Sequence, residues 1–109
     1  MAYDAALAAR LRADLAGRPG LEERRMFGGL CIMLDGNMLC GTYADTVMYR
    51  VGKDKAAEAL ALPRVRAMEM AGRAMGGFVT IDAADFADPA LRGRLMAMAL
   101  AFVGSLPRK

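Results

Sequence analysis

The chain has 109 residues, which is the length of a single domain. Its formal charge of +3 comes from 15 basic and 12 acidic residues, and this mild imbalance lacks the basic stripe that is typical of dedicated nucleic-acid-binding proteins. The absence of histidine removes the usual general base, and the two cysteines are too few for a tetrahedral zinc site.

Apolar residues make up 56% of the chain, above the ordinary share of about 45–50%. Because a domain of this size has a small interior, we expect a buried interface between two copies, most simply a two-fold homodimer. The N-terminal stretch lacks the basic and apolar pattern of a leader, and the longest apolar run, 95–103, is shorter than the ~20 residues that span a bilayer. We therefore expect a soluble cytoplasmic protein with reduced thiols and no membrane contact.

The N-terminal segment is predicted to be a helix that begins after Asp4, a suitable N-cap, and ends near Gly17. Its apolar residues recur every four positions, at Tyr3, Leu7, Leu11 and Leu15.

Two apolar runs, 26–34 and 38–43, flank an Asp-Gly pair, which is typical of a β-hairpin. Both runs are apolar throughout, so we expect helices to cover one face of these strands and a partner subunit to cover the other. A third strand is predicted at 47–51, where Met48 and Arg50 share the face opposite Val47.

The second half of the chain is predicted to hold a helix at 53–62, ended by Pro63, and two further strands at 64–70 and 75–81. After a turn region at 82–89, Asp88 is expected to cap a last helix that opens with Pro89. The apolar stripe of this helix is wider than one sheet requires, which is a second reason to expect a dimer; it comprises Leu91, Leu95, Met96, Met98, Ala99, Phe102, Val103 and Leu106.

The order α-β-β-β-α-β-β-α predicts a single α+β domain, residues 1–109, with an antiparallel sheet of about five strands flanked by helices. With a two-residue Asp35-Gly36 loop, Cys31 and Cys40 would lie directly opposite each other in the hairpin. A change of one residue would move them to opposite faces. In either case two small buried apolar residues are favoured over a redox switch.

Two short stretches have nearly the same sequence motif, RMFGGL at 25–30 and RAMGGF at 73–78. Neither fits a dinucleotide fingerprint or a P-loop, and neither precedes a helix N-terminus that would face a phosphate. We therefore interpret the glycine pairs as places where another part of the chain approaches the backbone closely. The structural motif residues are Met26, Phe27, Gly28, Gly29, Met75, Gly76, Gly77 and Phe78.

No catalytic, cofactor-binding or metal-binding residues are predicted. The only serine, Ser105, has no histidine partner, and Asp82, Asp85 and Asp88 fit a capping role, so an enzyme is not expected. The methionines are interpreted as core residues rather than as copper ligands. Five arginines form a candidate interaction surface if the two hairpins adjoin, although a solvated surface of mixed charge is the simpler interpretation; they are Arg24, Arg25, Arg64, Arg66 and Arg73.

The stretches RRMFGGLCIMLDGNMLCGTYADTVMYRV and AGRAMGGFVTI together resemble the N-terminal domain of the TfoX/Sxy family. The resemblance covers nearly the whole chain, from about Leu7 to Leu106, and rests on the order of the pieces more than on any one of them. It implies the α+β fold given above and an association with the regulation of natural competence in bacteria. The family offers no established catalytic residues, so the resemblance assigns none to this chain. Phe78 stands where the family often has Tyr, and full-length competence regulators carry a second, helical domain.

Three functions remain open at this point. The first is a non-enzymatic, dimeric regulatory module that contacts proteins of the transcription machinery. The second is a small-ligand-binding domain with its pocket between the sheet and the last helix. The third is direct but weak DNA binding through the arginines.

Overall fold

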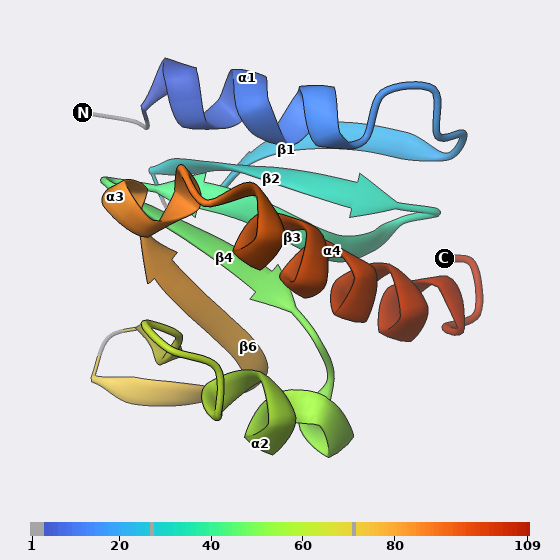
Figure 1. Cartoon of the computed structure of the whole chain (residues 1–109). Coiled ribbons are helices and arrows are strands. Elements are labelled where there is room, and N and C mark those ends of the chain that lie inside the picture. The colour runs from blue at the N-terminus through green and yellow to red at the C-terminus, as the bar shows by residue number, and fades with distance from the viewer. Residues whose placement is uncertain (1–3, 27, 71) are drawn as a thin grey trace.

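The structure, a computed structural model, describes residues 4–26, 28–70 and 72–109. The elements follow one another as α1 (Ala5–Asp14), β1 (Leu21–Met26), β2 (Gly29–Leu34), β3 (Asn37–Tyr43), β4 (Thr46–Arg50), α2 (Lys53–Leu60), β5 (Arg66–Met70), β6 (Arg73–Asp82), α3 (Ala83–Phe86) and α4 (Pro89–Gly104). The predicted α+β class and the order of the predicted helices and strands are confirmed, although the strand predicted from residue 26 begins at Gly29 and the strand predicted from residue 64 begins at Arg66 (Figure 1).

The strands form one antiparallel sheet in the order β1-β2-β3-β4-β6-β5. The sheet has six strands rather than about five, because residues 21–26 pair with β2 as an additional edge strand. The interior positions of β1, from Glu22 to Arg25, are all charged and exposed. The strand therefore lacks the apolar alternation that identifies a half-buried strand in a sequence, and its charges suit an edge that must not pair with other chains.

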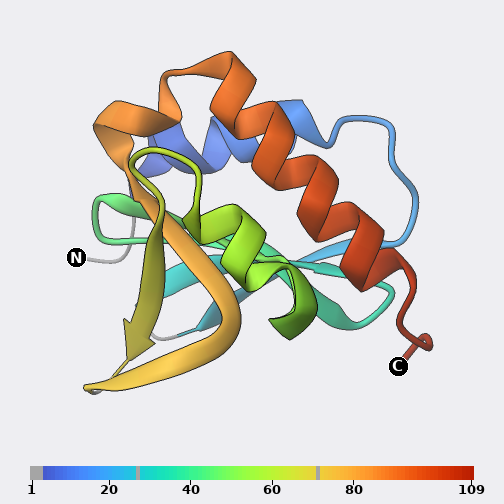
Figure 2. The same cartoon turned by 60° about the horizontal axis from the view of Figure 1, so that its bottom comes forward.

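Helices α1 and α4 cover one face of the sheet, and α2 packs along β6 (Figures 1 and 2). Asp4 caps α1 by accepting hydrogen bonds from the backbone N–H groups of Ala6 and Leu7, and Asp88 caps α4 in the same way. The side chains between the sheet and the helices form the helix-side core, which includes Leu11, Leu39, Val47, Tyr49, Val79, Ile81 and Leu95, all fully buried.

The opposite face of the sheet carries a second apolar group, which we call the methionine cluster. Its buried members are Cys31, Met33, Met48 and Met68, and its half-buried members are Met26, Met38, Met75 and Phe78. Met68 belongs to β5, at the far edge of the sheet from β1, and it joins the same cluster as Met48 of β4 and Cys31 and Met33 of β2. The second face of β2 is thus apolar, as the sequence suggested, and the structure of one chain does not test whether a partner subunit covers it.

Strand β6 bends strongly in both views (Figures 1 and 2). The β5–β6 pairing shifts between Ala67 and Glu69, so residues 75–78 of β6 have no partner in the ladder with β5. Gly77 lies in this segment with φ +84°, a conformation that side chains other than glycine rarely adopt. A glycine therefore stands where the strand must bend to bring β5 round to the methionine cluster.

The wide apolar stripe of α4 is used within the chain. Met96, Ala99 and Val103 are buried in the helix-side core, and Met98, Phe102 and Leu106 pack against it half-buried. The wide stripe that suggested a dimer thus has partners inside one subunit, whereas the apolar second face of β2 and β3 keeps half-buried side chains such as Met38. The homodimer stays a prediction.

The β2–β3 hairpin turns at Asp35-Gly36, as predicted, with positive φ at both residues. Its register shifts after the turn: Met33 pairs with Met38, but Ile32 pairs with Cys40, so Leu39 is an extra residue on β3. Cys31 therefore faces Gly41 rather than Cys40. Cys31 joins the methionine cluster and Cys40 the helix-side core, so of the two arrangements that the sequence left open the structure has the cysteines on opposite faces, because a bulge shifts the register by one residue.

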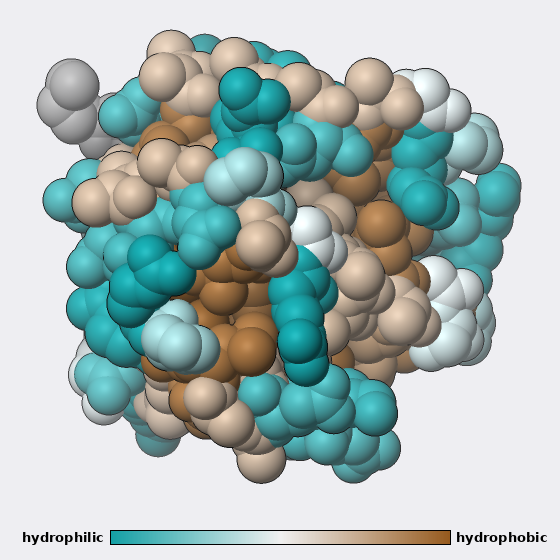
Figure 3. Space-filling view, viewed as in Figure 1, coloured by the Kyte–Doolittle hydropathy of each residue, from teal (hydrophilic) through white to brown (hydrophobic). Residues whose placement is uncertain are grey.

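The surface on the helix side is mixed in character. Figure 3 shows apolar side chains between α4 and α2, framed by hydrophilic residues. A hollow of about 400 Å³ between the two helices is lined by Met98 and Phe102 of α4 and by Glu58 of α2, among others. None of the helices in the described part of the chain has the length and apolarity needed to cross a bilayer.

Candidate interaction groove

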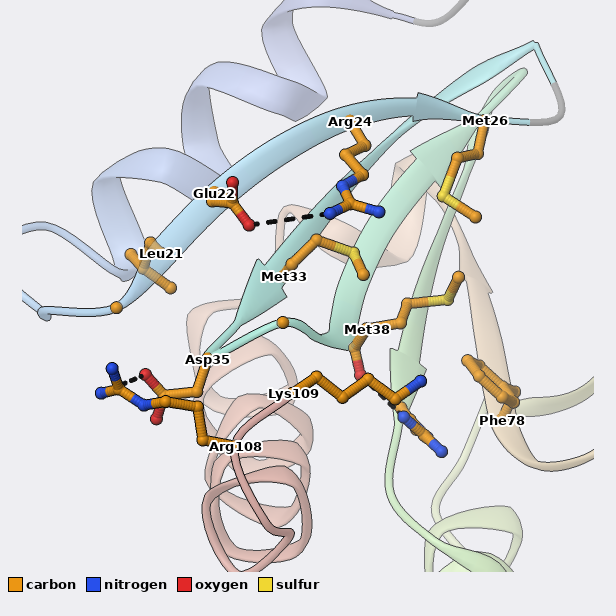
Figure 4. Close-up of a pocket in the computed structure, with 13 residues that line it drawn as sticks. Leu21, Glu22, Arg24, Met26, Met33, Asp35, Met38, Phe78, Arg108 and Lys109 are labelled. Atoms are coloured by element: carbon orange, nitrogen blue, oxygen red, sulfur yellow. Dashed lines mark hydrogen bonds and ion pairs between the residues drawn. The ribbon is translucent and has the colours of Figure 1, made fainter.

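A groove of about 800 Å³ lies on the face of the sheet turned away from α1 and α4 (Figure 4). It is bordered by β1, by the β2–β3 turn and by the C-terminal segment that follows α4. Its lining residues are Gly20, Leu21, Glu22, Arg24, Met26, Met33, Asp35, Gly36, Met38, Arg50, Phe78, Arg108 and Lys109. The groove therefore exposes the edge of the methionine cluster together with a group of charged side chains.

The floor of the groove consists of methionine side chains from three neighbouring strands. Met26 of β1, Met33 of β2 and Met38 of β3 point into it, and Phe78 of β6 closes one end (Figure 4). Methionine is unbranched and polarizable, so it adapts its shape to what it contacts more readily than a branched aliphatic side chain does. The floor is an apolar surface of adaptable shape.

Arg24 stands on the β1 side of the floor. Strand alternation places Glu22, Arg24 and Met26 on the groove face of β1, and Arg24 lies 3.9 Å from the Glu22 carboxylate. Both side chains are more than half exposed, so this ion pair contributes little to stability. The Arg24 guanidinium is consequently available for another carboxylate at small cost.

Arg50 forms part of the opposite side of the groove, at the end of β4. Its guanidinium lies over the rings of Phe78 and Phe102, 5.7 Å and 5.6 Å from their centroids, and donates a long hydrogen bond of 3.5 Å to the Met38 carbonyl oxygen. These contacts fix a positive charge beside the methionine floor.

The C-terminal segment forms the third side, because it is tied to the β2–β3 turn at three points. The Lys109 backbone N–H donates to the Asp35 carbonyl oxygen at 2.9 Å, and the buried Asn37 amide donates to the Pro107 carbonyl oxygen at 3.0 Å. Arg108 pairs with the Asp35 carboxylate at 3.2 Å. This attachment brings two further cations, Arg108 and Lys109, to the groove.

The groove has an excess of positive charge. Four cationic side chains line it, Arg24, Arg50, Arg108 and Lys109, against the two carboxylates of Glu22 and Asp35. An apolar floor with cationic sides suits an anionic partner that also carries apolar groups.

The structure divides the five arginines named from the sequence. Arg24 lies in the groove, whereas Arg25 shares the other side of β1 with Glu23, which pairs with Arg12 of α1 at 2.6 Å. The hydrogen bond from Arg12 lowers the pKa of the Glu23 carboxyl below its usual value. Arg73 is the first residue of β6, opposite Met70 at the tip of the β5–β6 hairpin.

Arg64 and Arg66 are both held by aspartates near α3. Arg64 pairs with Asp85 at 3.3 Å and with Asp88 at 2.9 Å, and Arg66 forms an ion pair with Asp82. The hydrogen bond from Arg64, with those from the backbone at the start of α4, lowers the pKa of Asp88.

The strand predicted at 64–70 begins only at Arg66, because Arg64 has a positive φ of 70° and lies in the turn before β5, so the two arginines do not share a strand face. Of the three aspartates interpreted as caps, Asp88 caps α4 with its side chain, whereas Asp82 makes no side-chain cap hydrogen bond and Asp85 lies within α3. All three pair with Arg64 or Arg66.

The glycine pairs lie where the backbone is approached closely. A Cβ on Gly29 would lie against the Thr42 carbonyl oxygen and 3.2 Å from the Tyr43 Cα across the hairpin. A Cβ on Gly77 would lie 3.1 Å from the backbone nitrogen of Lys53, where α2 begins. Phe27, the residue directly before Gly28, lies outside the described residues.

Burial raises the pKa of both thiols, Cys31 and Cys40, and it raises the pKa of Tyr49 as well. The Tyr49 side chain is fully buried, and its hydroxyl has no hydrogen-bond partner among the described residues. Within the same residues, no group of three or more carboxylates, thiols or imidazoles is placed to hold a metal ion.

Sequence reasoning did not single out most of the groove. Arg50, Arg108, Lys109 and Met38 were not named as site residues, although the alternation of 47–51 already placed Arg50 on the same face as Met48. No pattern in the sequence indicates that the C-terminal segment reaches the β2–β3 turn.

Comparison with known families gives one match, to the TfoX N-terminal domain, over residues 13–103. Comparison with curated proteins gave no match, and comparison with solved structures gave none. The matched range takes in every strand of the sheet and nearly all of α4.

Proposed function

The chain belongs to the TfoX N-terminal domain family, and we propose that it is a non-enzymatic regulatory module that works by binding another protein. The family is associated with competence regulation, which makes a component of the transcription machinery the partner we propose. The proposal concerns the domain itself and requires no cofactor.

The observation that carries the proposal is the groove, which combines a methionine floor with four cationic side chains. Apolar and aromatic groups flanked by charges are typical of the surfaces through which proteins recognise one another. The methionines add the adaptability found at surfaces that accept a partner's side chains. Nothing in this combination calls for chemistry on a bound substrate.

The space between the sheet and α4, which the sequence suggested for a small ligand, is filled by the protein itself. Leu95, Ala99 and Val103 of α4 are at most 2% exposed and pack onto the sheet. The groove lies on the other face and is open to solvent along its length (Figure 4). These features favour a macromolecular partner over a small enclosed ligand.

The proposal is tested by charge reversal in the groove. Arg24 and Arg108 are 58% and 78% exposed, so the double variant Arg24→Glu/Arg108→Glu should fold normally. The matched control, Arg10→Glu/Arg94→Glu, makes the same change of charge on exposed residues of α1 and α4. Circular dichroism and thermal unfolding establish that both variants are folded.

Cross-linking in a lysate of the source cells, followed by mass spectrometry, should identify partners that the wild type and the control capture and the groove variant does not. Equal capture by all three proteins would contradict the proposal. Salt-sensitive binding of duplex DNA that the groove variant loses, without a protein partner, would favour the DNA-binding alternative.

The predicted homodimer is tested separately. Light scattering at micromolar concentration should give twice the mass of the 11.6 kDa chain if the prediction holds. A monomer would mean that the apolar excess is accounted for by the two intramolecular clusters.

A further inference from the structure

The shape and charge of the groove point to the kind of segment that fills it. Resting on the proposed function, we infer that the groove binds an amphipathic helix of a partner protein whose apolar face meets the methionines and whose flanks are acidic.

The strands beneath the middle of the floor, β2 and β3, have both edges paired with neighbouring strands. β2 and β3 each have a neighbour on both sides, β1 with β2 and β4 with β3, so their N–H and C=O groups are used in the ladders. An extended segment laid across Met33 and Met38 would leave its own backbone groups facing thioethers, which is costly. A helix satisfies its backbone internally and presents only side chains to the floor.

The cations stand on two sides of the floor. Figure 4 shows Arg24 of β1 on one side of Met33 and Met38, and Lys109 of the C-terminal segment on the other. A helix lying between them with a leucine-type stripe downward would place its two flanks within reach of these charges. Acidic residues on both flanks would be complementary, and basic residues would be repelled.

The carboxylates already in the groove hold the arginines only weakly. Glu22 lies 3.9 Å from Arg24, and the Arg108–Asp35 pair involves an arginine that is 78% exposed. Exposed pairs of this kind exchange partners at little cost. The carboxylates of an incoming helix can thus replace them without breaking a buried network.

The size of the molecule limits the helix. The longest dimension of the domain is 32 Å, so a helix crossing this face has at most about 20 residues. An isolated helix of this length is only marginally stable in water, which means that such a segment would gain much of its order on binding.

The test uses four fluorescent synthetic peptides of about 18 residues with the isolated chain. The first carries leucines at helical spacing with glutamates on both flanks. The second has the same composition in scrambled order, the third replaces glutamate by lysine, and the fourth is the first peptide with a central proline. Binding is measured by fluorescence anisotropy at physiological salt.

The first peptide should bind at least tenfold more tightly than the other three. The Arg24→Glu/Arg108→Glu variant should weaken its binding at least tenfold, and the Arg10→Glu/Arg94→Glu control should leave it unchanged. Equal binding of the scrambled peptide would show attraction by charge alone, and equal binding of the proline peptide would show an extended occupant; either result would overturn the inference.

The same experiments identify any other molecule that binds in the groove instead of such a helix. Self-association that the groove variant abolishes, with no peptide binding, would assign the groove to a second copy of the chain and overturn the inference. Groove-dependent capture of a protein that none of the peptides can displace would overturn the helix while leaving the proposed function in place. The proposed function fails only if capture itself does not depend on the groove.

Discussion

The face of the sheet beneath the helices and the face that lines the groove are packed with different kinds of side chain. Leucine, valine, isoleucine and Tyr49 dominate the helix-side core, and its largest members are fully buried. Sulfur-containing side chains make up all of the methionine cluster except Phe78, and half of its members are only half-buried. Neighbouring residues of one strand supply both faces in alternation: in β4, Val47 and Tyr49 belong to the helix-side core and Met48 to the methionine cluster.

The two kinds of side chain have different roles: those of the helix-side core specify the fold, and those of the methionine cluster can adapt their shape. Branched aliphatic side chains have few rotamers and pack in one arrangement, which specifies how the helices sit on the sheet. Methionine has three rotatable bonds and tolerates a changed neighbour. A sheet that is specified on one face can remain adjustable on the other, and the predictions below measure how far this separation goes.

The largest effect is expected from a cavity in the helix-side core. Leu95→Ala removes a fully buried side chain of α4 and should cost about 3 kcal/mol of unfolding free energy. Met38→Ala, at the half-buried floor of the groove, should cost less than about 1 kcal/mol, because it removes little buried area and leaves no closed cavity. Urea unfolding of both variants gives the comparison. Equal losses would mean that the methionine cluster is as rigidly packed as the core.

The bend that joins the two faces is tested at Gly77. Gly77→Ala should destabilise the fold by about 2 kcal/mol, because φ is +84° and the new Cβ would press on the backbone of Lys53. Gly93→Ala is the control: it lies in α4 with no atom within 4 Å of the new Cβ, and should stabilise by up to about 1 kcal/mol. Thermal unfolding monitored by circular dichroism measures both. A neutral Gly77→Ala would show that β6 can bend elsewhere.

Alkaline pH should act through the thiols of the two faces. Because burial raises the pKa of Cys40 in the folded state, the unfolded chain loses its proton first as the pH passes about 8.5. Stability is therefore retained at pH 7 and falls above pH 8.5, by up to about 1.4 kcal/mol per pH unit for this group. Urea unfolding at pH 7, 9 and 10 measures the fall.

Cys40→Ala should remove more of this alkaline loss than Cys31→Ala, since Cys40 belongs to the helix-side core and its pKa is raised first by burial and further by the nearby groups Cys31 and Asp14. The quantity compared is the slope of unfolding free energy against pH, so any change in stability that a variant already shows at pH 7 cancels. Identical slopes in the two variants would indicate that both faces exclude water equally.

The smallest effects are expected from ion pairs. Asp14 pairs with Arg92 at 3.2 Å at the junction of α1 and α4, where the two side chains are only 20% and 14% exposed. Asp14→Ala should cost about 1 kcal/mol, because it leaves a largely buried guanidinium with fewer partners. Arg24→Ala in the groove should cost less than about 0.5 kcal/mol. Chemical denaturation in low and high salt distinguishes the two, and a costly Arg24→Ala would argue that Arg24 supports the fold rather than a partner.

Much of the helix-side face could be predicted from the sequence. The spacing of Leu7, Leu11 and Leu15, the caps at Asp4 and Asp88, and the Asp-Gly hairpin each depend on local chemistry that a sequence displays. These signals give the fold class and the order of the elements.

The groove face was harder to predict because it depends on residues far apart in the chain. β1 is an edge strand of charged residues and has no apolar period to recognise. The bend that brings Met68 into the same cluster as Cys31 and Met33 follows from an irregular β5–β6 register, and the site of Arg108 and Lys109 follows from contacts across some 70 residues. Contacts between residues so far apart in the chain depend on how the whole domain packs, and they produce no local sequence pattern.

The bulge at Leu39 has a consequence for oxidation. With Cys31 and Cys40 on opposite faces of the hairpin, their Cβ atoms point apart, and no disulfide can join them while the strands keep this register. A covalent link between them would require β2 and β3 to slip by one residue, which would turn the side chains of β2 to the other face and set Met33 beneath the helices. A Cys31–Cys40 disulfide formed under oxidising conditions would thus mark molecules in which β2 and β3 have the wrong register. Reduction of that disulfide would allow these molecules to return to the native pairing.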